Sequence, residues 1–360
     1  MNKTGKTAVI SIYPGIGDII WHLPFFRAIA KKLEKKRIYL FTRKTTLAKE
    51  ILKYDKAIAK VHYLNETREF FNTITNFPKI IRILKKEKFE TIWIFHRSPR
   101  YAIIARLAKI KNIYGFGLGA QRIWLTSKKS IGQDSKETDN IYKAKRFLSI
   151  HGIKDHQDFK LKLPEFVVNK ELKKFKKFAK PWIAVGFSCN KTAFMRNNLP
   201  YSFYRTWRPE YFSKLINIFL NKNKRKTVFL IGAENELNLA KKIKKKCYFR
   251  NNIVISCSPI ITNLSILIKS KCFIGNDSGP LNLSGAIGTK SFGLFGASPP
   301  IKNINNVYAL VPPTGPVDPH KYGFNPIPLK EGMDLIKPES NQGSCTTYLY
   351  VKLCYIFLNL

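Results

Sequence analysis

Apolar positions in the first half of the chain repeat with two different periods. Short runs rich in β-branched residues, the first at 7–13, are typical of buried strands. Longer segments with apolar residues every three or four positions, the first at 18–33, are typical of helices. Such an alternation predicts a parallel sheet covered on both faces. The predicted strands are 7–13, 37–42, 59–64, 91–96 and 112–116, with helices at 18–33, 47–52, 78–88 and 101–109.

The alternation starts again at residue 182. Residues 164–181, which begin and end with proline and contain a lysine-rich run, are typical of a connection between domains. We therefore predict two Rossmann-like domains, 1–163 and 182–336, followed by an atypical tail, 337–360. Because open parallel sheets bind ligands outside the carboxyl ends of their strands, a functional cleft is expected between the domains. The predicted strands here are 182–188, 227–232, 252–257, 272–275 and 291–295, with helices at 209–220, 234–245, 262–270 and 280–287.

Charge changes this picture only in part. The chain has 360 residues, 64 of them basic and 23 acidic, so its formal net charge is +41 at pH 7. Such a surface attracts polyanions, whether nucleic acid, anionic lipid headgroups or phosphorylated glycans. The basic residues are spread along the whole chain beside Ile and Asn, a composition that an A+T-rich coding sequence would also produce. The charge therefore indicates a class of partner and no single one.

Composition also bears on location and on metals. An apolar content of 44% is that of a globular chain. The first apolar run, 7–13, is too short for the core of a secretory signal. The six cysteines form no C-x-x-C pair, and the six histidines form no ligand cluster. We therefore expect a reducing, cytoplasmic location and no metal site.

The first motif with chemical interest follows the first predicted strand and reads Tyr-Pro-Gly-Ile-Gly-Asp over residues 13–18. Its spacing is not that of a dinucleotide site, and a carboxylate at this helix start would repel a phosphate. Asp18 is either a helix cap or a base for an acceptor that Gly15 and Gly17 allow to come close. His22, one turn further on, either orients this carboxylate or is an ordinary, partly buried histidine.

The second motif follows the predicted strand 272–275 and places Asp277, Ser278 and Gly279 before a proline. Proline is tolerated in the first turn of a helix, so a helix is predicted to start at this point. Free backbone N–H groups at such a start can bind an anion such as a phosphate. The alternative is a well-capped helix without a ligand, although the glycine-containing segment 291–296 favours the phosphate.

Two further segments of the second domain carry candidate side chains. Glu234 follows a predicted strand, where a carboxylate can accept hydrogen bonds from ribose hydroxyls or can simply favour a helix N-terminus by its charge. Residues 188–212 contain cations that would suit a phosphate, although most cations of so basic a chain are solvated. These side chains are Lys191, Arg196, Arg205 and Arg208, with Trp207 among them.

Taken in order, these segments resemble glycosyltransferase family 9, the ADP-heptose:lipopolysaccharide heptosyltransferases. The family's strand, Gly-Asp, helix and Leu-Pro signature is similar to residues 10–24, and its Lys-x-Trp-Pro loop is similar to residues 205–207. Its Gly-x-x-Glu segment is similar to residues 232–236, and its Asp-Thr-Gly-x-x-His-Leu motif is similar to residues 277–283. The chain departs from the family at Asn282, where the family usually has His, and at Arg208, which intervenes before the proline.

The resemblance implies an α/β protein of the GT-B fold, in which two Rossmann-like domains with parallel sheets face each other across a cleft. It also implies an inverting, metal-independent sugar transfer that needs no cofactor besides its donor substrate, ADP-heptose above all. Asp18 would be the catalytic base, and Gly15 and Gly17 would form the acceptor loop. The donor would be bound by Arg205, Glu234, Asp277, Ser278 and Gly279, with Glu234 on the ribose.

The partners implied are a lipid-linked, phosphorylated glycan acceptor of the lipopolysaccharide core type and the anionic inner membrane, at whose surface the enzyme would be peripheral. Two alternatives stay open. The same fold could use another donor, such as a UDP-sugar or a GDP-sugar. A polyanion- or nucleic-acid-binding protein without catalysis would also suit the charge, although the sequence has no recognised nucleic-acid motif.

Overall fold

The structure is a computed structural model, and its chain divides into two units, Met1–Phe159 and Lys160–Leu360. The residues described are 5–64, 70–132, 140–154, 158–189, 205–222, 224–296, 299–300, 304, 306–316 and 332–338. Each unit contains one parallel sheet with helices on both faces, as the alternating pattern predicts. No helix in these described ranges combines the length and the apolar character needed to cross a bilayer.

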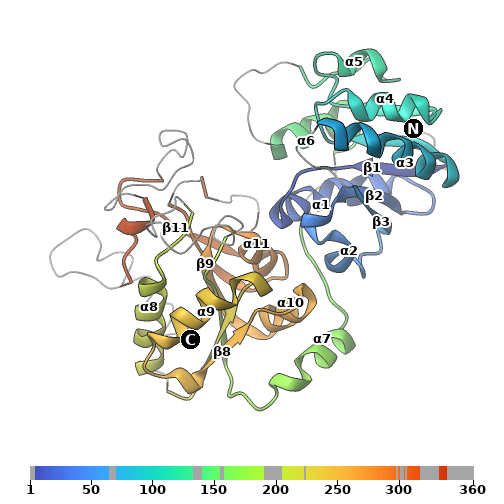
Figure 1. The fold of residues 1–360 in the computed structure, drawn as a ribbon. Coiled ribbons are helices and arrows are strands. Elements are labelled where there is room, and N and C mark those ends of the chain that lie inside the picture. Colours follow the sequence, from blue (N-terminus) through green and yellow to red (C-terminus); the bar gives the residue numbers. More distant parts are fainter. Residues whose placement is uncertain are drawn as a thin grey trace. The chain divides into compact units, whose positions relative to one another are not determined.

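The sheet of the first unit has five parallel strands in the order β3-β2-β1-β4-β5 (Figure 1). The central strand β1 is buried along four of its five residues, which explains why it reads as a continuous apolar run. The strands are β1 (Lys6–Ile10), β2 (Ile38–Arg43), β3 (Ile58–Leu64), β4 (Phe89–Ile94) and β5 (Asn112–Gly115).

Helices cover both faces of this sheet. Ile10 and Ile94 share a core cluster with residues of α3 and α4 on one face. Trp93, which alternates with Ile94 along β4, contacts Phe147 of α6 on the other face, with 5.4 Å between ring centroids. The helical segments are α1 (Ile16–Lys31), η1 (Lys44–Thr46), α2 (Ala48–Ile51), α3 (Phe70–Lys86), α4 (Arg100–Leu107), α5 (Gln121–Trp124) and α6 (Asn140–Ile150).

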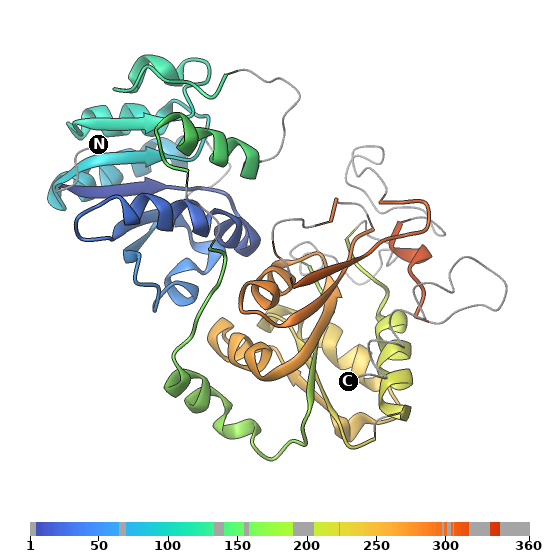
Figure 2. The same ribbon diagram turned by 180° about the vertical axis from the view of Figure 1, so that it is seen from behind.

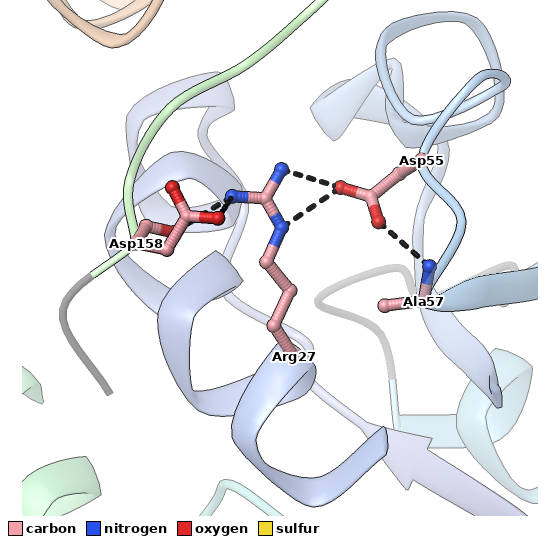
Figure 3. A network of polar contacts seen from close by, with 4 residues as sticks. All are labelled: Arg27, Asp55, Ala57 and Asp158. Carbon is pink, nitrogen blue, oxygen red and sulfur yellow. Dashed lines mark hydrogen bonds and ion pairs between the residues drawn. The ribbon is translucent and has the colours of Figure 1, made fainter. Parts of the chain in front are cut away.

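A polar network fixes helix α1 to the rest of its unit (Figure 3). The Nε and Nη2 atoms of Arg27 donate to Oδ2 of Asp55 at 3.0 and 2.7 Å, and Oδ1 of Asp55 accepts from the N–H of Ala57 at 2.9 Å. Nη1 of Arg27 donates to the backbone oxygen of Asp158 at 2.7 Å, near the end of the first unit. The Asp55 side chain is 5% exposed, so this ion pair is shielded from water and its geometry is well defined.

The second unit has a six-stranded parallel sheet in the order β11-β10-β9-β6-β7-β8 (Figure 2). Because the strands are parallel, their carboxyl ends all lie at one edge of the sheet. Residues that follow β6, β7 and β9 therefore come to this edge. The strands are β6 (Trp182–Gly186), β7 (Thr227–Ile231), β8 (Ile253–Ser256), β9 (Ser270–Asn276), β10 (Lys290–Leu294) and β11 (Val307–Leu310).

The helices of this unit also lie on both faces. Phe212 of α8 and Ile243 of α9 belong to the core cluster on one face, and Phe175 contacts Phe229 of β7 on the other. The helical segments are α7 (Glu165–Leu172), η2 (Lys173–Phe175), α8 (Pro209–Lys222), η4 (Glu234–Glu236), α9 (Leu237–Lys245), η5 (Arg250–Asn252), α10 (Ile260–Lys269), α11 (Gly279–Ala286) and η7 (Gly332–Leu335).

Residues 164–181, predicted as an interdomain connection, contain α7 and η2 and belong to the second unit. Val168 and Leu172 of α7 are buried, and α7 contacts α10. Thr262 of α10 donates a hydrogen bond to the carboxylate of Glu171. The segment therefore packs as part of a domain, and its lysines are exposed to solvent.

Candidate functional site

Asp18 lies in the first turn of α1, the helix that follows β1 and the loop of residues 11–15. Its Oδ2 atom accepts a hydrogen bond from the backbone N–H of Gly15 at 2.8 Å. A Cβ atom on Gly15 would lie only 2.9 Å from that Oδ2, so glycine is what allows the carboxylate to fold back over the turn. The carboxylate is therefore a helix cap, as one prediction had it, and it is partly exposed at the same time, as a base must be.

Aromatic rings surround the start of α1. His22 is fully buried, and its Nδ1 lies 2.7 Å from the backbone oxygen of Asp18. The His22 ring stacks on Tyr13 at 4.8 Å between centroids. Burial and the nearby charge of Asp18 raise the pKa of the Tyr13 phenol. His22 therefore packs the helix start through its ring and the backbone of Asp18, and it is more buried than the sequence predicted.

A cationic group that sequence reasoning missed lies at the same edge of the first sheet. Burial, and then the charges of Arg100, Arg43 and Arg97, lower the pKa of His96 to about 4. The His96 ring is 6.4 Å from the ring of Tyr13. His96 is therefore neutral at pH 7, and the potential near the end of β4 is positive. The available signal was the His-Arg-Ser-Pro-Arg run over residues 96–100, directly after a buried strand.

The second candidate centre is the start of α11 in the second unit. Ser278 is the N-cap of this helix with extended backbone angles, and Gly279 and Pro280 form its first turn. Within the described residues, the Oγ atom of Ser278 is shielded from solvent and has no hydrogen-bond partner. Asn282 donates from Nδ2 to the backbone oxygen of Ser278 at 2.9 Å, so its amide lies back along its own helix. A hydroxyl without a partner at the N-terminus of a helix, where the first backbone N–H groups have no partner within the helix, is the arrangement expected of an anion site.

Arg205 and Asp277 form an ion pair at this helix start. Nη2 of Arg205 lies 3.0 Å from Oδ2 of Asp277, whose side chain is 10% exposed while that of Arg205 is 42% exposed. The neighbouring backbone is fixed as well, because the N–H of Trp207 donates to Oδ1 of the buried Asn276 at 3.1 Å. Asp277 therefore positions a cation beside the N-terminus of α11, and the guanidinium still reaches solvent.

The segment 332–338 contacts the loop that carries Arg205. Arg208 donates through Nε and Nη2 to the two carboxylate oxygens of Asp334, both at 2.5 Å, and Asp334 is 2% exposed. The indole N–H of Trp207 donates to the backbone oxygen of Ile336 at 2.6 Å. Sequence patterns do not connect Arg208 with Asp334, because more than a hundred residues separate them.

The two acidic residues that follow β7 differ in their exposure to solvent. Glu234 is exposed, whereas Glu236 is 9% exposed and its Oε2 accepts from the N–H of Ala233 at 2.7 Å. Burial raises the pKa of Glu236, and hydrogen bonds from Ala233 and the Ser188 hydroxyl act against this shift. A Cβ on Gly232 would lie 2.7 Å from Cζ of Phe187 and 3.1 Å from Oε2 of Glu236, so glycine makes room for the Phe187 ring first and for this carboxylate second. Sequence reasoning assigned the ribose contact to Glu234 and included Glu236 only as the last residue of the segment similar to the family's Gly-x-x-Glu.

The predicted residues thus gather in two places, one in each unit. Gly15 and Asp18 meet at the end of β1, with Gly17 in the first turn of α1. Arg205, Asp277, Ser278 and Gly279 meet at the start of α11. Lys191, Arg196 and the tail from 339 onward lie outside the described residues. Across the described part of the chain, no three His, Cys, Asp or Glu side chains gather as metal ligands.

Comparison with known proteins places this geometry in context. Residues 77–306 match the profile of glycosyltransferase family 9 (heptosyltransferase). None of the curated protein sequences compared with the chain matches it.

Among solved structures, ADP-heptose lps heptosyltransferase II of E. coli is similar with a TM-score of 0.71 and 12% identity, over 98% of each chain. A family 9 glycosyl transferase from Veillonella parvula has a TM-score of 0.73 and 14% identity, over 100% of this chain and 99% of that one. E. coli heptosyltransferase WaaC, solved with ADP-2-deoxy-2-fluoro heptose, has a TM-score of 0.64 and 12% identity, over 96% and 99%. These structures have the GT-B fold, so the predicted α/β fold with two parallel sheets of the GT-B type is confirmed.

Proposed function

We propose that the chain, which belongs to glycosyltransferase family 9 and is therefore a glycosyltransferase, moves a heptose from ADP-heptose to a lipopolysaccharide core or a related glycan. Support for this donor comes from the similar E. coli WaaC, which has been solved with ADP and with ADP-2-deoxy-2-fluoro heptose. The single observation that carries the proposal is the pair of centres at strand ends, a carboxylate in one unit and an anion site in the other.

In this proposal Asp18 is the general base. Its carboxylate takes the proton of the acceptor hydroxyl as that oxygen attacks the anomeric carbon of the donor, and the nucleoside diphosphate leaves from the opposite face. One bond to the anomeric carbon forms and one breaks, and because the two lie on opposite faces of that carbon its configuration inverts. The N–H of Gly15 keeps Oδ2 in place, which lowers the entropy lost when the reactants align.

The leaving diphosphate is held by the N-terminus of α11. We assign the backbone N–H groups of Ser278 and Gly279, the unsatisfied Ser278 hydroxyl and the Arg205 guanidinium to its charge, and this set replaces a metal ion. Asp277 acts by positioning Arg205. Groups that are already oriented toward the developing charge stabilise a transition state without reorganisation during the reaction.

In this proposal the ribose of the donor is bound by the two acidic residues after β7. Glu234, the residue expected from the sequence, is solvated and loses little by remaining unpaired, whereas Glu236 is already desolvated beside Gly232. A buried carboxylate gains more from a ribose hydroxyl than an exposed one does. We therefore assign the main ribose contact to Glu236 and a peripheral one to Glu234.

The acceptor of this proposal is anionic and linked to lipid. Arg43, Arg97 and Arg100 near His96 supply a positive potential at the edge of the sheet where Asp18 lies, which suits a phosphorylated or carboxylated sugar. The reaction would take place in the cytoplasm, at the inner membrane surface.

A thermal-shift panel tests the donor. ADP, UDP, GDP and CDP are added in turn at saturating concentration, with a short oligonucleotide as the polyanion control. We expect ADP to raise Tm most. A ligand at a hundred times its Kd stabilises the folded protein by about 2.7 kcal/mol, so the shift from the preferred nucleotide is readily measured. A larger shift with UDP or GDP would reassign the donor. A shift with the oligonucleotide and with none of the four nucleotides would overturn the transferase proposal in favour of polyanion binding.

A further inference from the structure

Exposed apolar side chains gather on one part of the first unit. Leu107 at the end of α4 is 54% exposed, and Ile123 and Trp124 on α5 are 73% and 38% exposed. The two helices contact each other (Figure 1). We call these three side chains, with the exposed cations Arg106 and Arg122, the α4–α5 patch.

Large exposed apolar side chains elsewhere in the described residues are isolated. They lie on separate elements: Tyr142 on α6 of the first unit, and Phe166 on α7, Tyr248 after α9 and Tyr308 on β11 of the second unit. Single exposed apolar residues are ordinary on a protein surface, whereas a group of them with a polar rim marks a binding surface. The α4–α5 patch is therefore the feature that needs an explanation.

The basic residues around this patch indicate an anionic partner. Between Glu90 and Asp134 the sequence has no acidic residue, and it has eight basic ones. The exposed members of this set are Arg97, Arg106, Lys109, Lys111, Arg122, Lys128 and Lys129. Cations near an anionic bilayer are attracted to its surface, and the exposed Leu, Ile and Trp side chains suit the boundary between headgroups and acyl chains. A second copy of the same basic chain would be repelled.

The patch is rigid and connected to the site. Arg106 donates to the backbone oxygens of Trp124 and Leu125 at 2.9 and 3.1 Å, which ties α5 to α4. The fully buried Gln121 donates to the backbone oxygens of His96 at 2.6 Å and Ser98 at 3.2 Å. The loop that carries His96 and its cations, next to Tyr13, is therefore held directly against α5.

From this arrangement we propose that the α4–α5 patch is a docking surface for an anionic lipid bilayer, with Leu107, Ile123 and Trp124 entering the headgroup region. Docking through α5 brings the lipid surface next to the residue 96–100 loop and the Asp18 edge of the same unit. The proposal rests on the proposed function in one respect: access to a lipid-linked acceptor is the reason for docking. The binding itself does not require catalysis.

Co-sedimentation of the full chain with vesicles tests this. Wild type is mixed with vesicles of phosphatidylcholine alone and with vesicles that also contain phosphatidylglycerol, and the double variant Ile123→Ser/Trp124→Ser is compared with Tyr248→Ser. We expect wild type and Tyr248→Ser to bind the anionic vesicles alike, and the double variant to bind about tenfold more weakly. The ADP thermal shift, measured on all three proteins, reports on folding and on the donor site independently of lipid.

Three outcomes would overturn the proposal. Wild type could fail to bind the anionic vesicles, or the double variant could bind them as wild type does, which would assign any binding to diffuse charge elsewhere. The third outcome is a wild-type dimer in sedimentation velocity that the double variant abolishes without a change in lipid binding, which would make the patch a protein interface. Loss of the ADP shift in wild type with lipid binding intact would contradict the donor proposal and leave the docking surface standing.

Discussion

The backbone N–H of Gly15 donates to Oδ2 of Asp18 at 2.8 Å, across a turn in which residue 15 has no side chain. The backbone of Gly15 has φ −99° and ψ 155°, values that any residue adopts, so the need for glycine here comes from the space above the turn. The relationship connects the identity of one small residue to the position of the proposed base.

Gly15→Ala separates the position of this base from the stability of the fold. The new Cβ would lie 2.9 Å from Oδ2, so the tip of the carboxylate must rotate away, whereas the backbone is not strained. We expect sugar transfer to fall about tenfold, with a change of less than about 1 kcal/mol in the free energy of unfolding. Steady-state kinetics and urea unfolding measure the two effects.

The matched control for that variant is Gly5→Ala, at the other end of β1. A Cβ on Gly5 would also meet a carboxylate, that of Glu90, with 2.7 Å to Oε2, but at the amino edge of the sheet. Its kinetics should equal those of wild type. Equal losses of activity in both variants would mean that crowding of the sheet, and not the position of Asp18, explains the effect.

Substitution of the two acidic residues after β7 distinguishes their roles. Glu236→Gln should weaken nucleotide binding by about tenfold or more, because a hydrogen bond to a buried charged group is worth about 1.5–3 kcal/mol. Glu234→Gln, at an exposed position, should change the Kd by less than about threefold. Calorimetric titration with ADP measures both. The reverse order of effects would return the ribose contact to Glu234.

The Arg208–Asp334 pair should matter for both stability and donor binding. Asp334→Asn leaves Arg208 without its charged partner, and it loosens the residues that hold Trp207 and Arg205. We expect a loss of about 1–3 kcal/mol in the free energy of unfolding, less than for a fully buried pair because the Arg208 side chain is 28% exposed. Arg208→Lys, which loses the two-pronged contact, should weaken ADP binding in the same direction. Unchanged stability and unchanged Kd in both variants would remove this segment from the account.

His96 predicts a pH dependence of stability. Its pKa is near 6.5 in an unfolded chain and about 4 in the folded protein, so between these values the unfolded state binds more protons. Stability is therefore lost as the pH falls below about 6.5, by up to about 1 kcal/mol per pH unit from this group. His96→Asn can still accept the N–H of Ser98 through its amide oxygen, and it removes the titration.

Urea unfolding at several pH values between 7.5 and 4.5 checks this on wild type and His96→Asn. Burial also lowers the pKa values of His62 and His151, so the variant should keep part of the slope. Curves that run parallel in the two proteins would show that His96 is protonated alike in the folded and unfolded states.

The alternating elements were predictable because buried parallel strands such as β1 are apolar throughout and the covering helices are amphipathic. The helical character of residues 165–172 was hidden by the surrounding lysines, since only Val167, Val168 and Leu172 mark its buried side. Helix α6 was not predicted, although its buried Ala144, Phe147 and Leu148 have helical spacing. Local signals of three residues are easily outweighed by charge and by nearby prolines.

The same criterion applies to the candidate site, because only features formed by residues close in sequence are visible in a pattern. Asp18 and the turn before α11 could be proposed from sequence because each depends on residues next to each other in the chain, a glycine turn or a helix start. The Arg205–Asp277 and Arg208–Asp334 pairs, and the difference in burial between Glu236 and Glu234, depend on strand order and packing. Pattern alone does not contain that information, because these contacts form only when distant strand ends come to one edge.

The central claim is that the Asp18 carboxylate is the base, and the variant Asp18→Asn tests it most directly. Asparagine has nearly the same shape and can still accept the N–H of Gly15, but it does not take a proton. Sugar transfer and the Kd for ADP are measured on the same preparation. The account predicts a loss of about a thousandfold in turnover with an unchanged Kd. Turnover at the wild-type rate would contradict it.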